Sequence, residues 1–176
     1  MIVVVGHGPS VRNNALGAVI DSCTVVRLKF GDKGEPEHWG TRTDYLCGRN
    51  VRHSERMPGT KFWHFGGDWT VKWLDYFESF RPRFPTKYGD IATKPSHGLC
   101  AAFACMEYLK PKELAFIGCD RLLRPDEQTW KWNSGEQCFP HDWHAEHRAL
   151  QGLGITIHDL RDIDWQSSST TTRTTA

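Results

Sequence analysis

Hydrophobic and polar positions alternate along this chain in blocks that predict strands separated by helices. Short apolar runs predict strands over residues 2–6, 23–28, 44–47, 61–65, 114–119 and 155–160. Apolar residues at helical spacing predict helices over residues 10–20, 69–80, 96–109 and from residue 141 or 142 to about 153. Such an alternation is typical of a single α/β, Rossmann-like domain with a mostly parallel open sheet flanked by helices.

The segments between these elements are expected to lack regular structure. Residues 81–94 contain proline and are predicted to form a loop, and residues 121–140 are predicted to be irregular. Residues 167–176 are polar and rich in serine and threonine, so they cannot bury a core. We therefore expect one folded domain over residues 1–166 and a disordered tail over residues 167–176.

Charge and hydropathy narrow the class of protein. The formal net charge is +1 with acidic and basic residues interspersed, which gives neither a nucleic-acid-binding surface nor a basic amphipathic helix for a membrane. No apolar run approaches the roughly 20 residues that span a bilayer, and the apolar start predicts a strand rather than a signal peptide. The six cysteines form no CxxC pair. We expect a cytoplasmic protein with reduced cysteines, no membrane span and no nucleic-acid partner.

The first segment with candidate chemistry is VVVGHGPS, residues 3–10. Glycines directly after a strand allow a phosphate to approach backbone N–H groups at the start of the next helix. The segment is not a dinucleotide fingerprint, because Val11 stands where the third glycine would be, and no Gly-Lys-Ser/Thr follows as in a P-loop. Two interpretations stay open here: a nucleotide contact and a tight strand-to-helix turn.

The second segment, residues 94–120, contains a helix start followed by a strand. Pro95, the capping residue Ser96 and Gly98 are typical of a helix N-terminus that binds an anion. Small residues further along the same helix allow it to pack closely on the sheet. Anion binding and plain helix packing both explain this pattern.

The third segment is HDWHAEH, residues 141–147, with Cys138 three residues before it. Residues three apart on a helix drift by about 60° per step, so four metal ligands at this spacing would not converge, and no CxxC or HExxH supports a zinc site. A histidine at a helix start that faces the strand ends is a candidate general base, since its ordinary pKa is about 6.5. Here that residue is His141, and Glu146 orients its ring or caps the helix. A solvated helix end rich in histidine is the remaining interpretation.

Taken in order, the three segments resemble the sialyltransferases of glycosyltransferase family 29. VVVGHGPS, residues 18–31 and residues 38–44 resemble the long sialyl motif of that family. Pro95-Ser96-His97-Gly98 followed by residues 114–118 resembles the short motif, and a histidine followed five residues later by glutamate resembles the last one. The resemblance covers most of residues 2–153. More loosely, residues 6–10 are similar to the Gly-Asn-Gly-Pro-Ser start of bacterial sialyltransferases.

This resemblance implies an inverting glycosyltransferase with a variant of the GT-A fold over residues 1–166. It would transfer sialic acid or a related acidic sugar from a CMP-sugar donor to a hydroxyl of a glycan or glycoconjugate acceptor, without a metal or other cofactor. The family implies that His141 is the general base, and Glu146 is the second catalytic residue. The positions expected to bind the donor are Gly6, His7, Gly8, Ser10 and Lys29 at the nucleotide, and Ser96, His97 and Gly98 at the phosphate and sugar carboxylate.

Three positions depart from the family pattern. His7 and Lys29 stand where asparagine is usual, and His97 stands where threonine is usual. A catalytically inactive module that binds CMP or another nucleotide is therefore an alternative. A small zinc-binding protein is a further one, with the candidate ligands Cys138, His141, His144 and His147.

Overall fold

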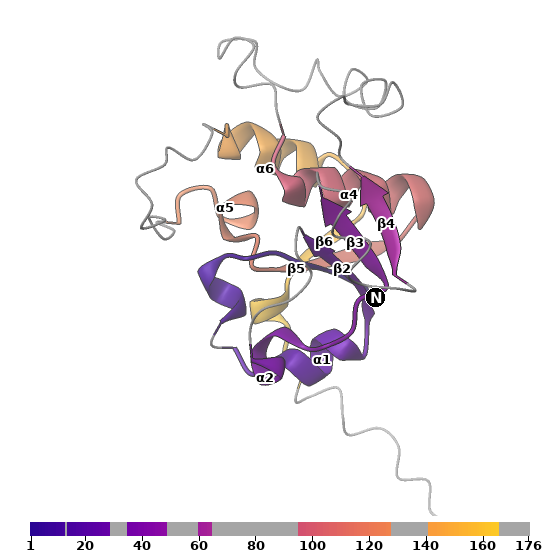
Figure 1. Ribbon diagram of the computed structural model, residues 1–176. Coiled ribbons are helices and arrows are strands. Elements are labelled where there is room, and N and C mark those ends of the chain that lie inside the picture. Colours follow the sequence, from indigo (N-terminus) through magenta and orange to yellow (C-terminus); the bar gives the residue numbers. More distant parts are fainter. Residues whose placement is uncertain (13, 29–34, 49–59, 65–94, 128–140, 166–176) are drawn as a thin grey trace, which may run out of the picture.

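The computed structural model describes residues 1–12, 14–28, 35–48, 60–64, 95–127 and 141–165 (Figure 1). Its centre is a six-stranded sheet in the order β4-β3-β2-β1-β5-β6, in which every neighbouring pair is parallel. The strands are β1 (Ile2–Val5), β2 (Thr24–Leu28), β3 (Tyr45–Gly48), β4 (Lys61–His64), β5 (Glu113–Ile117) and β6 (Thr156–Asp159). The predicted parallel α/β fold is confirmed.

Helices cover both faces of the sheet (Figure 1). On one face lie α4 (His97–Tyr108) and α6 (Trp143–Gln151), and on the other lie α1 (Gly17–Asp21), α2 (Pro36–Trp39) and the 3-10 turn η6 (Leu160–Asp162). The short helix α5 (Asp120–Leu123) follows β5 directly and packs against α6. No helix among the described residues is long and apolar enough to cross a lipid bilayer.

Side chains alternate between the two faces because successive residues of a strand point in opposite directions. In β1, Val4 packs in the core beneath α4 and α6, whereas Val3 and Val5 pack in the opposite core with α1. In β5, Phe116 and Ile117 divide in the same way, and all five side chains are at most 1% exposed. Full burial of one such side chain contributes about 1.5–3 kcal/mol, which explains why the strands are nearly continuous apolar runs.

The structure differs from the expected elements at α2 and η6, where no helix was predicted, and in two further places. The helix expected over residues 10–20 is replaced by a 3-10 turn, η1 (Pro9–Val11), followed by the short α1. Asn14 causes the break, because its side chain donates to the Ser10 carbonyl and accepts the N–H of Leu16. The second of these is α5, which begins at Asp120 and extends into residues 121–140, the stretch expected to be irregular. The expected helix over 69–80, the loop over 81–94 and the tail lie outside the described residues.

The order of the strands creates a topological switch at β1. From β1 the chain builds the sheet outward through β2, β3 and β4, and it then returns to place β5 on the other side of β1. Open α/β sheets bind ligands in the crevice at the carboxyl ends of the strands where the order reverses. The turn after β1 and the loop after β5 therefore form the floor of the expected binding site.

Candidate functional site

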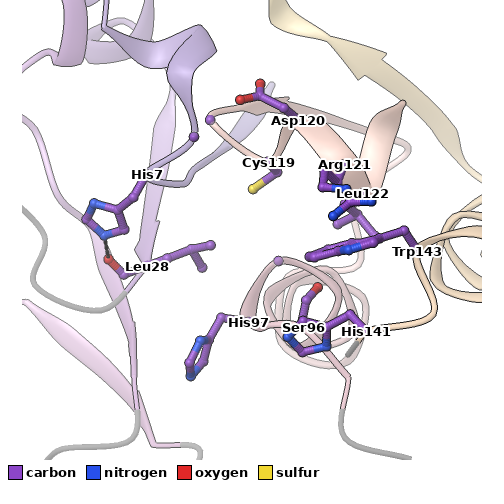
Figure 2. A pocket seen from close by; sticks show the side chains of 13 residues that line it. His7, Leu28, Ser96, His97, Cys119, Asp120, Arg121, Leu122, His141 and Trp143 are labelled. Atoms are coloured by element: carbon purple, nitrogen blue, oxygen red, sulfur yellow. Dashed lines mark hydrogen bonds between the residues drawn. The ribbon is translucent and has the colours of Figure 1, made fainter. Parts of the chain in front are cut away.

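A pocket of about 230 Å³ lies at the switch point, at the carboxyl ends of β1 and β5 (Figure 2). The turn after β1 contributes His7 and Gly8, and the first turn of α4 contributes residues 96–98. The loop after β5 contributes residues 118–122, and the start of α6 contributes His141 and Trp143. Segments that are far apart in the sequence thus meet around one cavity.

The predicted site residues fall into three groups in the structure. Six of them line the pocket together: His7, Gly8, Ser96, His97, Gly98 and His141. Glu146 lies directly behind His141, whereas Gly6 and Ser10 are in the turn below and do not line the cavity. Lys29 lies outside the described residues. The roles assigned to all these residues stay predictions.

The glycine-rich turn is bonded to β5 rather than open to a phosphate. Its N–H groups at Gly6 and Gly8 donate to the carbonyls of Ile117 and Gly118, both at 2.7 Å. The N–H of Ser10 donates to the Asp120 carboxylate at 3.2 Å. A Cβ at Gly6 would overlap the Gly118 carbonyl oxygen, so the glycines allow the two strand ends to approach closely. These contacts favour the tight-turn interpretation for three of the N–H groups that could have held a phosphate.

His7 forms part of the wall opposite α6. Its Nε2 lies 2.8 Å from the carbonyl oxygen of Leu28 and therefore donates to it, since a carbonyl only accepts. Its ring packs at a tilt against Trp39, with 5.5 Å between the ring centres. The two contacts fix the orientation of this ring at the edge of the pocket.

The most organised polar arrangement joins His141, Glu146 and Ser96. Oε1 of Glu146 lies 3.2 Å from Nδ1 of His141 and accepts the backbone N–H of Ser96 at 2.9 Å. Ser96 caps α4, and its hydroxyl accepts the N–H of Leu99. The Glu146 side chain is 2% exposed and sits at the N-terminus of α4, where the helix dipole stabilises a negative charge.

This arrangement defines what the imidazole can do. A carboxylate only accepts hydrogen bonds, so it favours a proton on Nδ1 of His141 and leaves Nε2 as the basic nitrogen of the neutral ring. Trp143 packs at a tilt against the same ring, with 4.9 Å between centres, and restricts its position further. A histidine oriented in this way at the wall of a pocket can take a proton from a hydroxyl.

The other two histidines of HDWHAEH do not join this group. Nε2 of His144 lies 3.3 Å from the Asp126 carboxylate at the exposed surface, and His147 donates from Nδ1 to the carbonyl of Leu122. Cys138 of the zinc alternative lies outside the described residues. In the parts of the chain that the structure describes, no three His, Cys, Asp or Glu side chains form a group that could hold a metal ion.

Three pocket residues, Cys119, Asp120 and Arg121, follow β5 and were not among the predicted site residues. Burial raises the pKa of the Cys119 thiol well above its usual range, and the nearby charges of Asp120 and Asp159 add to this, so the thiol stays protonated. Arg121 is exposed, and its guanidinium lies over the ring of Trp143. Only their position after a central strand could have identified them, since no local motif includes them.

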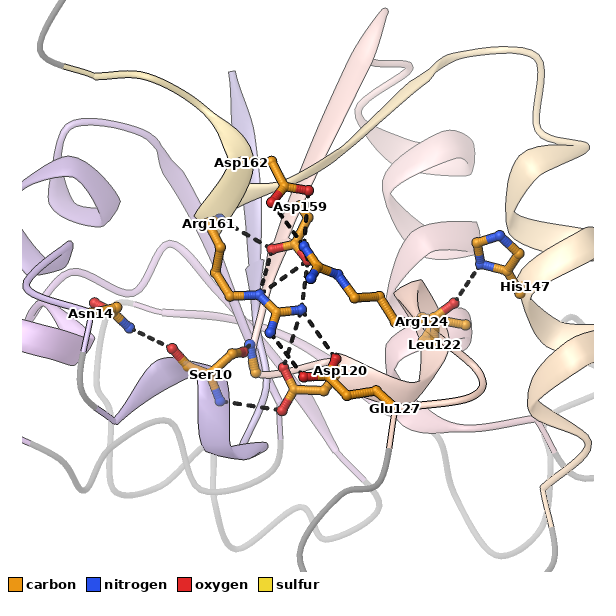
Figure 3. Close-up of polar contacts among 11 residues, drawn as sticks. Ser10, Asn14, Asp120, Leu122, Arg124, Glu127, His147, Asp159, Arg161 and Asp162 are labelled. Atoms are coloured by element: carbon orange, nitrogen blue, oxygen red, sulfur yellow. Dashed lines mark hydrogen bonds and ion pairs between the residues drawn. The ribbon is translucent and has the colours of Figure 1, made fainter.

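Asp120 connects the pocket to an ionic cluster at the end of β6 (Figure 3). Its carboxylate is 3% exposed and lies 3.9 Å from Arg161, which pairs at 2.6 Å with Asp159 and at 3.2 Å with Glu127. Burial alone would raise the pKa of Asp159, but the hydrogen bonds and charge of Arg161, with the charge of Arg124, outweigh it and lower that pKa. The cluster fixes Asp120 beneath the turn that follows β1.

Comparison of the chain with protein-family models and with curated proteins found no match.

Proposed function

We propose that this protein is a glycosyltransferase that moves sialic acid or a related acidic sugar from a CMP-sugar donor to a glycan hydroxyl. The observation that carries the proposal is the buried Glu146 carboxylate, which joins His141 to the N-terminus of α4 at the wall of the pocket. The position of that pocket at the switch point of a parallel sheet supports the same conclusion. The choice of CMP and of an acidic sugar rests on the resemblance of the sequence motifs.

In the proposed reaction, the acceptor hydroxyl oxygen attacks the anomeric carbon of the donor sugar. Nε2 of His141 takes the hydroxyl proton as the new carbon–oxygen bond forms. The bond between the anomeric carbon and the phosphate oxygen breaks, and CMP leaves with the electron pair. Attack in line with the leaving group inverts the configuration at that carbon.

Glu146 has a positioning role in this scheme. Its carboxylate orients the ring of His141 and stabilises the positive charge that the imidazole gains with the proton. The N–H of Ser96 and the α4 terminus keep that carboxylate in place although it is excluded from water. No step of the proposed reaction uses a metal ion.

The experiment is to incubate the purified protein with CMP-sialic acid, with and without a panel of glycan acceptors, and to measure the release of CMP. A UDP-sugar offered in parallel tests the choice of nucleotide. Release of CMP supports the proposal. Binding of CMP without any turnover would favour the inactive nucleotide-binding module, and stoichiometric zinc in the purified protein would favour the zinc-binding alternative.

A further inference from the structure

We infer that Arg121 binds the anionic group of the ligand in this pocket, with Trp143 holding the guanidinium in position. The inference deepens the proposed function, on which it rests only for the choice of ligand. The group recognised is a phosphoryl or carboxylate group, because both present two oxygens that match the planar fork of an arginine.

The wall that α5 and α6 form brings Arg121 and Trp143 into contact. The guanidinium carbon of Arg121 lies 5.5 Å from the ring centre of Trp143, within the range of a cation–π contact. The same ring packs against His141 at 4.9 Å. Figure 2 shows Trp143 between the two, with Arg121 on one side and His141 on the other. An anion bound by Arg121 would therefore lie at the same wall of the pocket as the proposed base, with Trp143 between them.

Arg121 gives one side of the pocket a positive charge. Among the described residues that line it, Arg121 is the one arginine or lysine. It forms no salt bridge with a carboxylate in the described part of the chain, whereas Arg161 and Arg124 are both paired with Asp159. Arg121 is exposed, so its donors are accessible to a ligand.

The backbone N–H groups of the glycine-rich turn, which the sequence suggested as donors to an anion, are already occupied. The N–H groups of Gly6, Gly8 and Ser10 are all bonded within the protein. The Asp120 carboxylate beneath the turn would repel an anion that approached it from the pocket. An acidic ligand is therefore best accommodated on the side of the pocket that Arg121 and Trp143 form.

The experiment compares Arg121→Gln with Arg148→Gln in binding assays by calorimetry. Arg148 is also exposed, but it lies on α6 away from the pocket lining, so it is a matched control. The probes are CMP, cytidine and free sialic acid. Because Arg121→Gln loses a charge-assisted contact, we expect its affinity for an anionic probe to fall about 10- to 100-fold and its affinity for cytidine to stay unchanged. A loss confined to CMP identifies a phosphate contact, and a loss confined to sialic acid identifies a carboxylate contact.

A further pair of variants tests the part played by Trp143. Trp143→Phe keeps an aromatic face and should retain most of the affinity for the anionic probe, whereas Trp143→Leu should weaken it together with the contact to Arg121. Lysine at position 121 keeps the charge but not the fork, so Arg121→Lys should recover only part of the affinity.

Three results would overturn the inference. The first two are unchanged binding of CMP and sialic acid by Arg121→Gln, and an equal loss of affinity for cytidine and CMP. A wild-type protein that binds neither anionic probe would also overturn it. These outcomes are separate from failure of the proposed reaction. If the protein binds CMP through Arg121 but never turns over a donor, the anion site stands and the proposed transferase activity fails. If Arg121→Gln turns over the donor at the normal rate, the transferase activity stands and the anion site fails.

Discussion

Nδ1 of His141 lies 3.2 Å from Oε1 of Glu146, and the same oxygen accepts the backbone N–H of Ser96. One carboxylate on α6 therefore joins His141, which precedes the N-cap of that helix, to the cap of α4 across the edge of the pocket. The position of the imidazole depends on the packing of the two helices against each other as well as on its own rotamer. Two substitutions of Glu146 separate its chemical part, the effect on the imidazole of His141, from its structural part, the effect on the stability of the fold.

Glu146→Gln tests the chemical part. The amide oxygen of glutamine can still accept the N–H of Ser96, but the side chain no longer carries a charge to orient and stabilise the imidazole. We expect donor turnover to fall on the order of 10²-fold or more while the protein stays folded. Initial rates of CMP release and far-ultraviolet circular dichroism measure the two effects. An unchanged rate would remove Glu146 from the mechanism.

Glu146→Ala tests the structural part. This substitution leaves the buried N–H of Ser96 without its acceptor, which should lower the free energy of unfolding by about 1–3 kcal/mol. Glu107→Ala is the matched control, because Glu107 is exposed on α4 and should change stability by no more than about 0.5 kcal/mol. Urea denaturation compares both with the wild type, and equal stabilities would show that the Ser96 contact contributes nothing.

Gly118→Ala and Gly154→Ala separate backbone strain from packing at the strand ends. Both glycines have nearly the same positive φ, +71° and +72°, so both substitutions introduce strain of about 1–2 kcal/mol. A Cβ at Gly118 would also lie 2.7 Å from the backbone of Gly6, whereas a Cβ at Gly154 meets nothing within 4 Å. We expect Gly118→Ala to be the more destabilising by a further ~1–3 kcal/mol in urea denaturation. Equal losses would show that the turn after β1 can move.

The ionic cluster at the end of β6 predicts a loss of stability in acid. The pKa of Asp159 is lowered in the folded protein, so its contribution to stability is present above the unfolded value of about 3.8 and is lost as pH falls below it. Asp159→Asn should therefore be less stable than the wild type at pH 7, and its stability should fall less steeply below pH 4. Asp21 also has a lowered pKa, so some dependence on pH should remain. Urea denaturation between pH 3 and pH 7 measures both curves, and parallel curves would contradict the role of Asp159.

The sequence was sufficient to predict the centre of the sheet because β1, β2 and β5 are mostly apolar runs with nearly all of their side chains buried. It did not predict the break after η1, where the side chain of Asn14 competes with helical hydrogen bonds. It did point to residues 141 and 146, which lie close together because they flank one helix start. Arg121 and Trp143 could not be paired in the same way, since they meet only through the packing of α5 against α6. The internal bonding of Gly6 and Gly8 likewise depends on β5, which is distant in sequence.

We propose that His141 is the base of a CMP-sugar transferase. The most direct measurement is the rate of CMP release from CMP-sialic acid by the wild type, His141→Ala and His144→Ala under the same conditions. His144 is exposed on α6 and pairs with the surface residue Asp126, so its loss controls for general effects on α6. We predict that His141→Ala loses on the order of 10²–10⁴ in rate while His144→Ala stays close to the wild type. Turnover by His141→Ala at the wild-type rate, or an equal loss in both variants, would contradict the account.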